Sequence, residues 1–101
     1  MNPIIIYTCI NNKDNAKTLA EKIINNNLAA CVNIIPIEQS VYLWNGKIES
    51  ESEFQLMIKT DIEYKSSLEK LIKDNHPYEL PEIIVINIDD GSNEYLNWIN
   101  N

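Results

Sequence analysis

The segment NHPYELPEIIV, residues 75–85, holds the only histidine of the chain, His76, and two carboxylates, Glu79 and Glu82, follow it closely. Imidazole nitrogen with oxygen ligands suits copper(II), which stands highest in the affinity order of the divalent metals. A histidine before a proline also has a structural interpretation, because the residue before proline avoids helical geometry and ends a helix. The segment therefore predicts either a metal ligand at His76 or a loop residue that bonds to the backbone.

The two cysteines, Cys9 and Cys31, offer little nucleophilic chemistry. Neither forms a C-x-x-C or Cys/His pair, and neither has an adjacent lysine or arginine that would lower a thiol pKa. A glycine-rich phosphate loop is not available either, since the only glycines are Gly46 and Gly91. We expect buried free thiols and a protein that is not an enzyme.

The charge of the chain favours cationic partners. The formal net charge is −7, and all 8 basic residues are lysines. This excess of acid disfavours nucleic acid, whose phosphates require a basic surface. Glu49, Glu51 and Glu53 alternate along one strand, either as an acidic rim that attracts cations or, as we favour, as a solvated strand face. No apolar run is long enough for a membrane helix and no signal peptide opens the chain, so we expect a cytoplasmic protein.

Hydrophobic periodicity predicts the elements that position these residues. Asn45-Gly46 is a strong hairpin signal, because both residues accept positive φ. The expected elements are strands over 3–10, 28–44, 47–60 and 82–88 and helices over 11–27, 61–75 and 92–100. This order, β-α-β-β-α-β, predicts one α+β, ferredoxin-like domain over residues 1–101, with an antiparallel sheet, a long hairpin and a short C-terminal helix.

The same pattern predicts how the strands are covered. Strand 3–10 is apolar on both faces and strand 82–88 is an apolar run, so we expect both to be buried on both sides. Pro36 predicts an edge strand or a bulge. In this topology strand 47–60 separates the strands of Cys9 and Cys31, which excludes a disulfide between them.

The hairpin is too long for one subunit. Each arm extends roughly 45 Å at about 3.3 Å per residue, whereas the covering helices span only about 21 Å. The overhang carries Val41, Leu43 and Ile48 on one face. Tyr42 and Trp44 lie on the other face. Either the hairpin bends back onto its own domain, or, as we favour, it packs on a second copy, because an apolar two-stranded ribbon is marginal alone.

Five segments, in order and spacing, resemble the CutA divalent-cation tolerance proteins: LAACVNIIP, SVYLWNGKIE, ESEFQLMIKT, HPYELPEIIV and YLNWI. The resemblance covers essentially the whole chain. It implies a ferredoxin-like subunit, a homotrimer in which hairpins contact neighbouring subunits, and a role in tolerance of divalent metals, copper(II) above all. The fold and trimer are also similar to the PII signalling proteins, so the alternative is a signalling or scaffold trimer that binds a small ligand or a protein in its intersubunit clefts.

The resemblance also implies site residues. In some bacterial members the metal-site candidates are a cysteine that ends the first strand and two consecutive histidines before the proline. Here Tyr7 stands at the cysteine position and Asn75 at the first histidine, so only His76 carries over directly. Cys9 lies on the same strand face as Tyr7. The implied ligand candidates for Cu(II) or another divalent cation are His76, Glu79, Glu82 and Cys9.

An intersubunit cleft is the second implied site. Lys59 resembles a lysine that recurs in the family, and packing of its aliphatic stem is the competing explanation. Tyr78 lies between two prolines and has a structural explanation of its own, which is to fix the loop before the last strand. The residues expected at this cleft are Tyr7, Lys59, Trp44, Lys47 and Tyr78.

Overall fold

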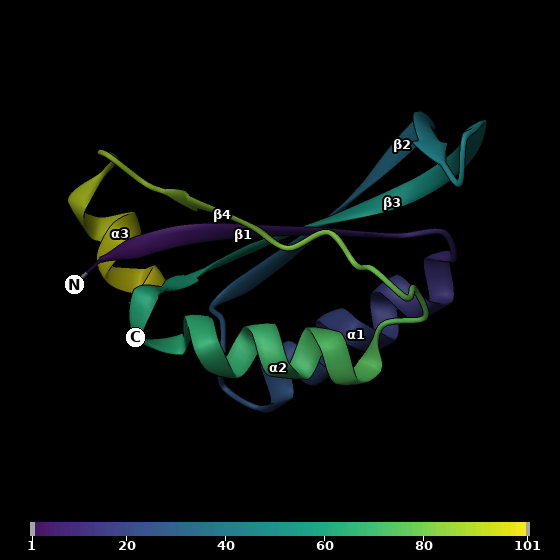
Figure 1. The fold of residues 1–101 in the computed structure, drawn as a ribbon. Helices are drawn as coiled ribbons and strands as arrows, with labels where there is room; N and C mark the ends of the chain where they lie inside the picture. The colour runs from purple at the N-terminus through teal and green to yellow at the C-terminus, as the bar shows by residue number, and fades with distance from the viewer. Residues whose placement is uncertain (1, 101) are drawn as a thin grey trace.

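The structure is a computed structural model that describes residues 2–100, and it has the predicted order of elements (Figure 1). The elements are β1 (Pro3–Ile10), α1 (Lys13–Asn25), β2 (Cys31–Trp44), β3 (Lys47–Asp61), η1 (Ile62–Tyr64), α2 (Lys65–Asn75), β4 (Ile84–Asn87) and α3 (Asn93–Ile99). The boundaries differ from the prediction mainly where a short 3-10 turn, η1, precedes α2 and where β4 is limited to four residues.

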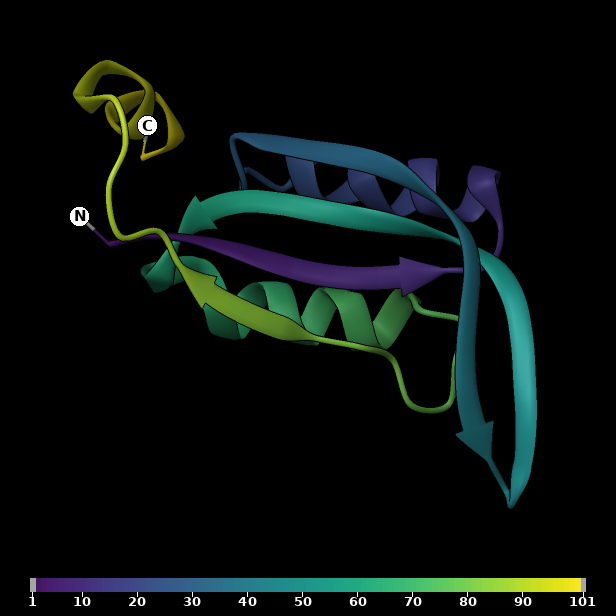
Figure 2. The ribbon, with the colours of Figure 1, turned by 90° about the horizontal axis from the view of Figure 1, so that it is seen from above.

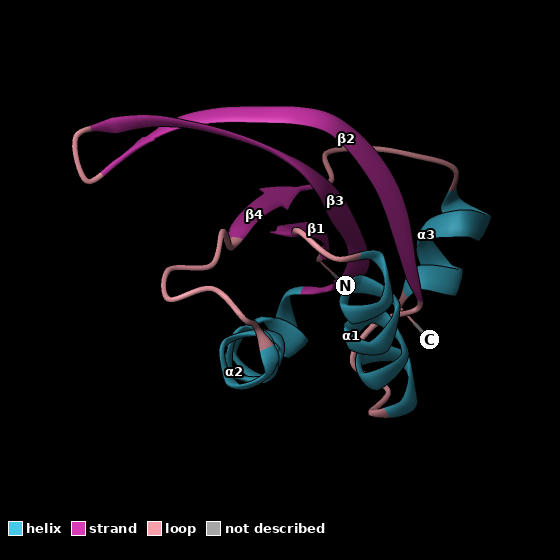
Figure 3. Cartoon of the chain, turned by 90° about the vertical axis from the view of Figure 1, so that its right-hand side faces the viewer, coloured by secondary structure: helices cyan, strands magenta, loops and turns pink. Residues whose placement is uncertain are grey.

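The strands form a single antiparallel sheet in the order β2-β3-β1-β4. Helices α1 and α2 lie side by side on one face of this sheet, and α3 lies beyond its end (Figures 1 and 3). This arrangement confirms the α+β, ferredoxin-like fold. Cys9 pairs with Gln55 and Cys31 pairs with Lys59 at separate points along β3. Both thiols are free, but only Cys9 is buried as expected, because Cys31 lies on edge strand β2 and is partly exposed.

Local chemistry explains where the helices and the turn lie. The Asn12 side chain caps α1 by accepting a hydrogen bond from the Asn15 amide at 2.9 Å. Asn27, at φ 56°, follows the end of that helix. The hairpin turn has φ 51° at Asn45 and φ 77° at Gly46, the positive values that a type I′ turn requires. Among residues 2–100, no helix has the length and apolarity that a membrane crossing would need.

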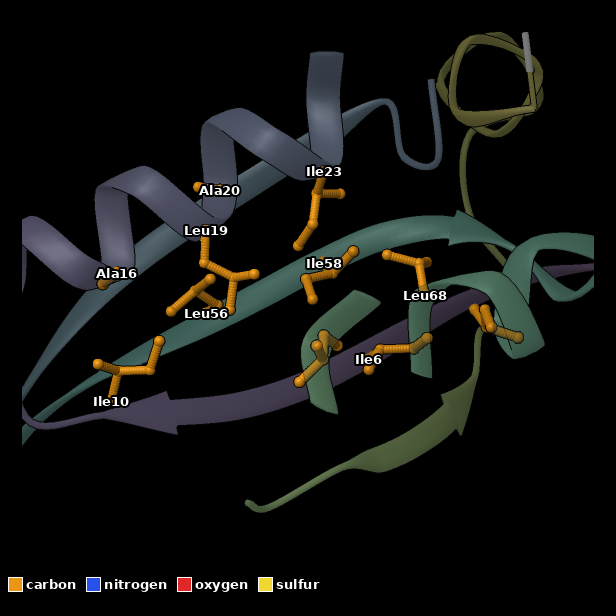
Figure 4. Close-up of a cluster of buried hydrophobic side chains, with 11 residues drawn as sticks. Ile6, Ile10, Ala16, Leu19, Ala20, Ile23, Leu56, Ile58 and Leu68 are labelled. Atoms are coloured by element: carbon orange, nitrogen blue, oxygen red, sulfur yellow. The ribbon is translucent and has the colours of Figure 1, made fainter. Parts of the chain in front are cut away.

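The core lies between the two helices and the sheet (Figure 4). Its strand residues alternate with outward-pointing ones, so every second side chain of β1 is fully buried. Each buried isoleucine or leucine contributes about 2 kcal/mol relative to an exposed one. The cluster consists of Ile4, Ile6, Ile10, Ala16, Leu19, Ala20, Ile23, Leu56, Ile58, Leu68 and Ile72.

The opposite sheet face, which we call the open face, corrects the expectation of burial on both sides. Within residues 2–100, α1 and α2 leave this face uncovered, α3 contacts it at Lys59 through Tyr95, and β4 forms a sheet edge. Ile84 and Ile86 of β4 are 49% and 46% exposed, and Ile5 and Tyr7 of β1 are half-buried. The prediction of a fully buried strand over 82–88 is therefore wrong for the single chain. An apolar run indicates that a strand is shielded from water, but it does not show whether the same chain or another molecule covers it.

The β2–β3 hairpin extends beyond the rest of the sheet and bends (Figures 2 and 3). Only the Phe54–Asp61 part of β3 pairs with β1, so residues 47–53 pair with β2 alone. Pro36 lies on edge strand β2, and the pairing register shifts by one residue between Ile37 and Ser40. Both consequences predicted for Pro36 are thus present.

Candidate functional site: an acidic cleft beside the hairpin

The loop of residues 76–83 faces the bent hairpin across a cleft of about 590 Å³. We call this the hairpin cleft. It lies on the open-face side of the sheet, because it includes Cys9 and Gln55, which pair across β1 and β3 on that face. Its lining residues are Cys9, Ile37, Ser40, Tyr42, Trp44, Glu51, Glu53, Gln55, Tyr78, Glu79, Leu80 and Glu82.

His76 uses both of its ring nitrogens on the backbone. Its Nε2 lies 2.8 Å from the carbonyl oxygen of Cys9, and its Nδ1 accepts a hydrogen bond from the Tyr78 amide at 3.1 Å. A carbonyl can only accept, so the Nε2 carries the proton and the ring is neutral. Burial lowers the pKa of His76, which also favours the neutral ring. In this geometry the imidazole has no lone pair left for a metal.

Cys9 and Glu82 form the closest pairing of ligand-type side chains in the cleft. The Cys9 Sγ donates toward the Glu82 Oε2 at 3.8 Å, and Cys9 is only 6% exposed. Burial, followed by the charges of Glu82 and Glu53, raises the pKa of the Cys9 thiol to about 12. The thiol is therefore protonated at neutral pH, and a metal would have to displace its proton.

Two tyrosine hydroxyls each donate a hydrogen bond to a glutamate of β3. The Tyr78 hydroxyl donates to Glu53 Oε2 at 2.7 Å, and the Tyr42 hydroxyl donates to Glu51 Oε1 at 2.9 Å. Burial and the bond to Glu53 raise the pKa of Tyr78, so this hydroxyl remains a donor. Glu53 is only 8% exposed, which contradicts the solvated strand face that we favoured for it.

Of the cleft residues that the predicted sites did not include, Glu53, Glu51 and Tyr42 matter most for its chemistry. The strand alternation places Glu53 on the same face as Gln55 and thus toward Cys9. That signal was available, but the burial depends on the bend of the hairpin and on the loop carrying Tyr78, and neither follows from local periodicity.

The four predicted metal ligands lie in two different pockets of the structure. Cys9, Glu79 and Glu82 line the hairpin cleft, whereas His76 lines a smaller pocket of about 360 Å³ beside α1 and α2. Within residues 2–100, no three His, Cys, Asp or Glu side chains converge closely enough to hold a metal ion. One chain in this conformation therefore provides part of a ligand set rather than a complete one.

The five residues expected at an intersubunit cleft are also spread out. Trp44 and Tyr78 line the hairpin cleft. Lys47 is at the hairpin tip, while Lys59 donates a hydrogen bond to the Tyr95 hydroxyl at 3.2 Å near α3. Roughly 40 Å of strand separates the two lysines at about 3.3 Å per residue. One chain cannot bring this set together, so any common cleft would need neighbouring subunits.

Comparison with known proteins identifies relatives over nearly the whole chain. The profile of the CutA1 divalent ion tolerance protein family matches residues 4–101. "Protein CutA, chloroplastic" of Arabidopsis thaliana is 43% identical over 98 residues, which cover 97% of this chain and 54% of the relative. "Divalent-cation tolerance protein CutA" of Yersinia pestis (strain Pestoides F) is 37% identical over 99 residues, covering 98% of this chain and 83% of the relative.

Solved structures agree with these sequence matches. The crystal structure of CutA1 from Oryza sativa has a TM-score of 0.94 and 41% identity, covering 98% of this chain and 91% of that chain. The chain spans about half the length of the two chloroplastic plant relatives, 54% and 55%. The name of the Yersinia relative is that of a divalent-cation tolerance protein.

Proposed function

Since the chain belongs to the CutA1 divalent ion tolerance family, we propose that it is a homotrimer that binds divalent cations, copper(II) above all. The observation that carries this proposal is the hairpin cleft, where the Cys9 thiol and four glutamates share one acidic lining with no lysine: Glu51, Glu53, Glu79 and Glu82. Carboxylate oxygens together with a sulfur ligand attract transition metals, and the cleft concentrates negative charge where a cation would enter.

The open face supports assembly into an oligomer. It presents apolar side chains from all four strands of the sheet, and contiguous apolar surface of this kind marks an interaction site. The overhanging hairpin adds exposed apolar groups, with Leu43 at 69% and Ile48 at 79% exposure. A second and third copy would cover both surfaces and would bring ligands from neighbouring chains to the incomplete site. The apolar residues of the open face are Ile5, Tyr7, Ile35, Ile37, Met57, Ile84 and Ile86.

A copper(II) titration by calorimetry tests the metal proposal. We expect saturable binding by the wild type, loss of that binding in Cys9→Ser, and retention in the matched control Cys31→Ser, because Cys31 does not line the cleft. Binding should strengthen as pH rises, since the Cys9 proton must leave. His76→Ala separates the two interpretations of the histidine: unchanged affinity assigns His76 to the loop, and lost affinity means that the ring leaves its backbone bonds to bind metal.

Equal copper affinity in the wild type and in Cys9→Ser, or no saturable binding in either, would contradict a metal site in the hairpin cleft. The trimer is tested separately by the molar mass in solution from light scattering. We expect three copies per particle, and a monomer at micromolar concentration would contradict the assembly.

The second candidate function is the PII-like one, a trimer that binds a small organic ligand. The volume of the hairpin cleft favours it, because about 590 Å³ falls in the range of small-molecule pockets and far exceeds the space of one metal ion. A ligand that binds only the native state must raise the unfolding temperature. A ligand screen by thermal shift in the presence of a chelator therefore separates this function from metal binding.

A further inference from the structure

We propose that the hairpin cleft binds an aliphatic organic cation with two or more ammonium groups, of the polyamine class. The proposal concerns the cleft already assigned to cations, so it rests on the proposed function in its choice of site, and it names a further class of ligand. It is carried by three features of the lining: a buried carboxylate without a counter-ion, acidic groups from two separate elements, and aromatic walls.

The buried carboxylate is Glu53. It is 8% exposed, and its one hydrogen bond in the described part of the chain comes from the neutral hydroxyl of Tyr78, on Oε2. A buried charge is costly unless a partner of opposite charge compensates it. The ion pairs within residues 2–100, Lys70–Asp74 and Lys73–Glu69, both lie on α2. Within the described residues of one chain, Glu53 therefore has no cationic side chain as a partner.

The remaining acidic groups lie on both sides of the cleft. Glu51 comes from β3, as Glu53 does, while Glu79 and Glu82 come from the loop of residues 76–83. No lysine belongs to the lining. Ammonium groups form strong charge-assisted hydrogen bonds with carboxylates. Two acidic walls on different elements suit a ligand with positive charges at both ends better than a single ammonium.

The other lining residues suit an organic cation rather than a bare metal ion. The side chains of Tyr42, Trp44 and Tyr78 contribute aromatic surface, and Ile37 and Leu80 contribute apolar surface. Aromatic rings attract ammonium groups through their π-electrons, and apolar side chains pack against methylene groups. A metal ion needs oxygen, nitrogen or sulfur ligands within about 2.6 Å and gains nothing from such walls. The hydroxyls of Tyr42 and Tyr78 already bond to Glu51 and Glu53, which fixes those carboxylates in place.

Calorimetric titration of the intact protein with spermidine, in buffer containing a metal chelator, tests the proposal. We expect saturable binding that weakens as salt is added. Glu53→Gln should weaken it by about tenfold or more, because glutamine keeps the shape and can accept the Tyr78 bond but removes the charge. The matched control, Glu69→Gln on α2, also removes one negative charge but lies outside the cleft and should leave the affinity within about twofold.

A second variant guards against misfolding of Glu53→Gln. Trp44 is 42% exposed at the hairpin, so Trp44→Leu removes an aromatic wall without disturbing the core, and we expect weaker spermidine binding. Absence of saturable spermidine binding by the wild type would overturn the proposal, as would equal weakening by Glu53→Gln and Glu69→Gln. Because the chelator removes metal, this result is independent of the copper titration: spermidine can fail while copper binds, and the reverse.

Discussion

The two faces of the sheet differ in what covers them. On the helix-covered face, Ile6, Leu56 and Ile58 are 0% exposed, and α1 and α2 account for their burial. On the open face, apolar side chains alternate with these along the same strands, yet Ile84 and Ile86 remain about half exposed. Apolar side chains occur on both faces, although the open face also carries polar ones such as Gln55 and Lys59, so the difference in burial lies mainly in where the chain places its two long helices.

The difference also separates stability from function. The helix-covered face contains the core residues that stabilise the subunit. The open face contains the residues that we propose contact other subunits or a ligand. The open face is itself uneven, because the loop of residues 76–83 buries Cys9 and Glu53 at the end near the hairpin. That end forms the acidic cleft, and the apolar remainder supports subunit contact.

The largest effect is expected from Ile58→Ala on the helix-covered face. The substitution leaves a cavity between β3 and the helices, so the free energy of unfolding should fall by about 4 kcal/mol. Urea denaturation measures this loss. The matched control is Met57→Ala, the adjacent and only partly buried residue on the open face, whose loss should depend on protein concentration because the proposed assembly would complete its burial. Equal, concentration-independent losses in both variants would mean that the two faces do not differ as described.

The next effect is expected from Ile86→Glu on the open face. Ile86 is 46% exposed in the single chain, so a glutamate there is tolerated by the subunit but would be buried in the proposed trimer. Burying an unpaired carboxylate costs about 2 kcal/mol or more, which weakens each subunit contact by roughly 30-fold or more. Sedimentation velocity should detect smaller particles. Ile24→Glu on α1, at 40% exposure, is the control, and dissociation of both variants or of neither would argue against the open face as the interface.

The smallest effect concerns the pH dependence of stability and the loop of residues 76–83. Burial holds the pKa of His76 below its ordinary value of 6.5, so the unfolded chain binds its proton more readily than the folded chain. The stability is therefore complete above pH 6.5 and is lost as pH falls from there through the folded pKa. A protonated Nδ1 would also face the Tyr78 amide donor.

The measurement is the unfolding temperature of the wild type and of His76→Gln between pH 7.5 and 5. Glutamine retains a donor near the Nε2 position and does not titrate. We expect the wild type to lose more than the variant over this interval, since both share every other titrating group. Parallel curves would show that His76 does not report on folding.

Much of the fold was predictable because its signals are local. The hairpin turn follows from Asn45-Gly46, the start of α1 from the Asn12 cap, and the end of α2 from His76-Pro77. The order of the elements then limited the topology to the observed sheet, and lengths alone predicted the overhang. The prediction that β4 is fully buried was wrong for the single chain, because an apolar sequence does not show whether a helix layer or a neighbouring molecule covers the strand.

The candidate site was predictable only in part. Cys9, Glu79 and Glu82 do share one cleft, whereas His76 lines another pocket. The burial of Glu53 was missed, because it depends on Tyr78, 25 residues further along the chain. Such a contact depends on the paths of two segments far apart in sequence, and a one-dimensional pattern does not contain them.

By itself, the sequence determined the elements, their order, the acidic balance and the family, because propensity, periodicity and spacing act within a few residues of each position. Tertiary structure alone decided which sheet face the helices cover, which carboxylate is buried and which atoms the His76 ring contacts. These outcomes arise where the bent hairpin meets the loop of residues 76–83. Their energies come from desolvation and hydrogen bonds between distant segments, which exist only once the chain has folded.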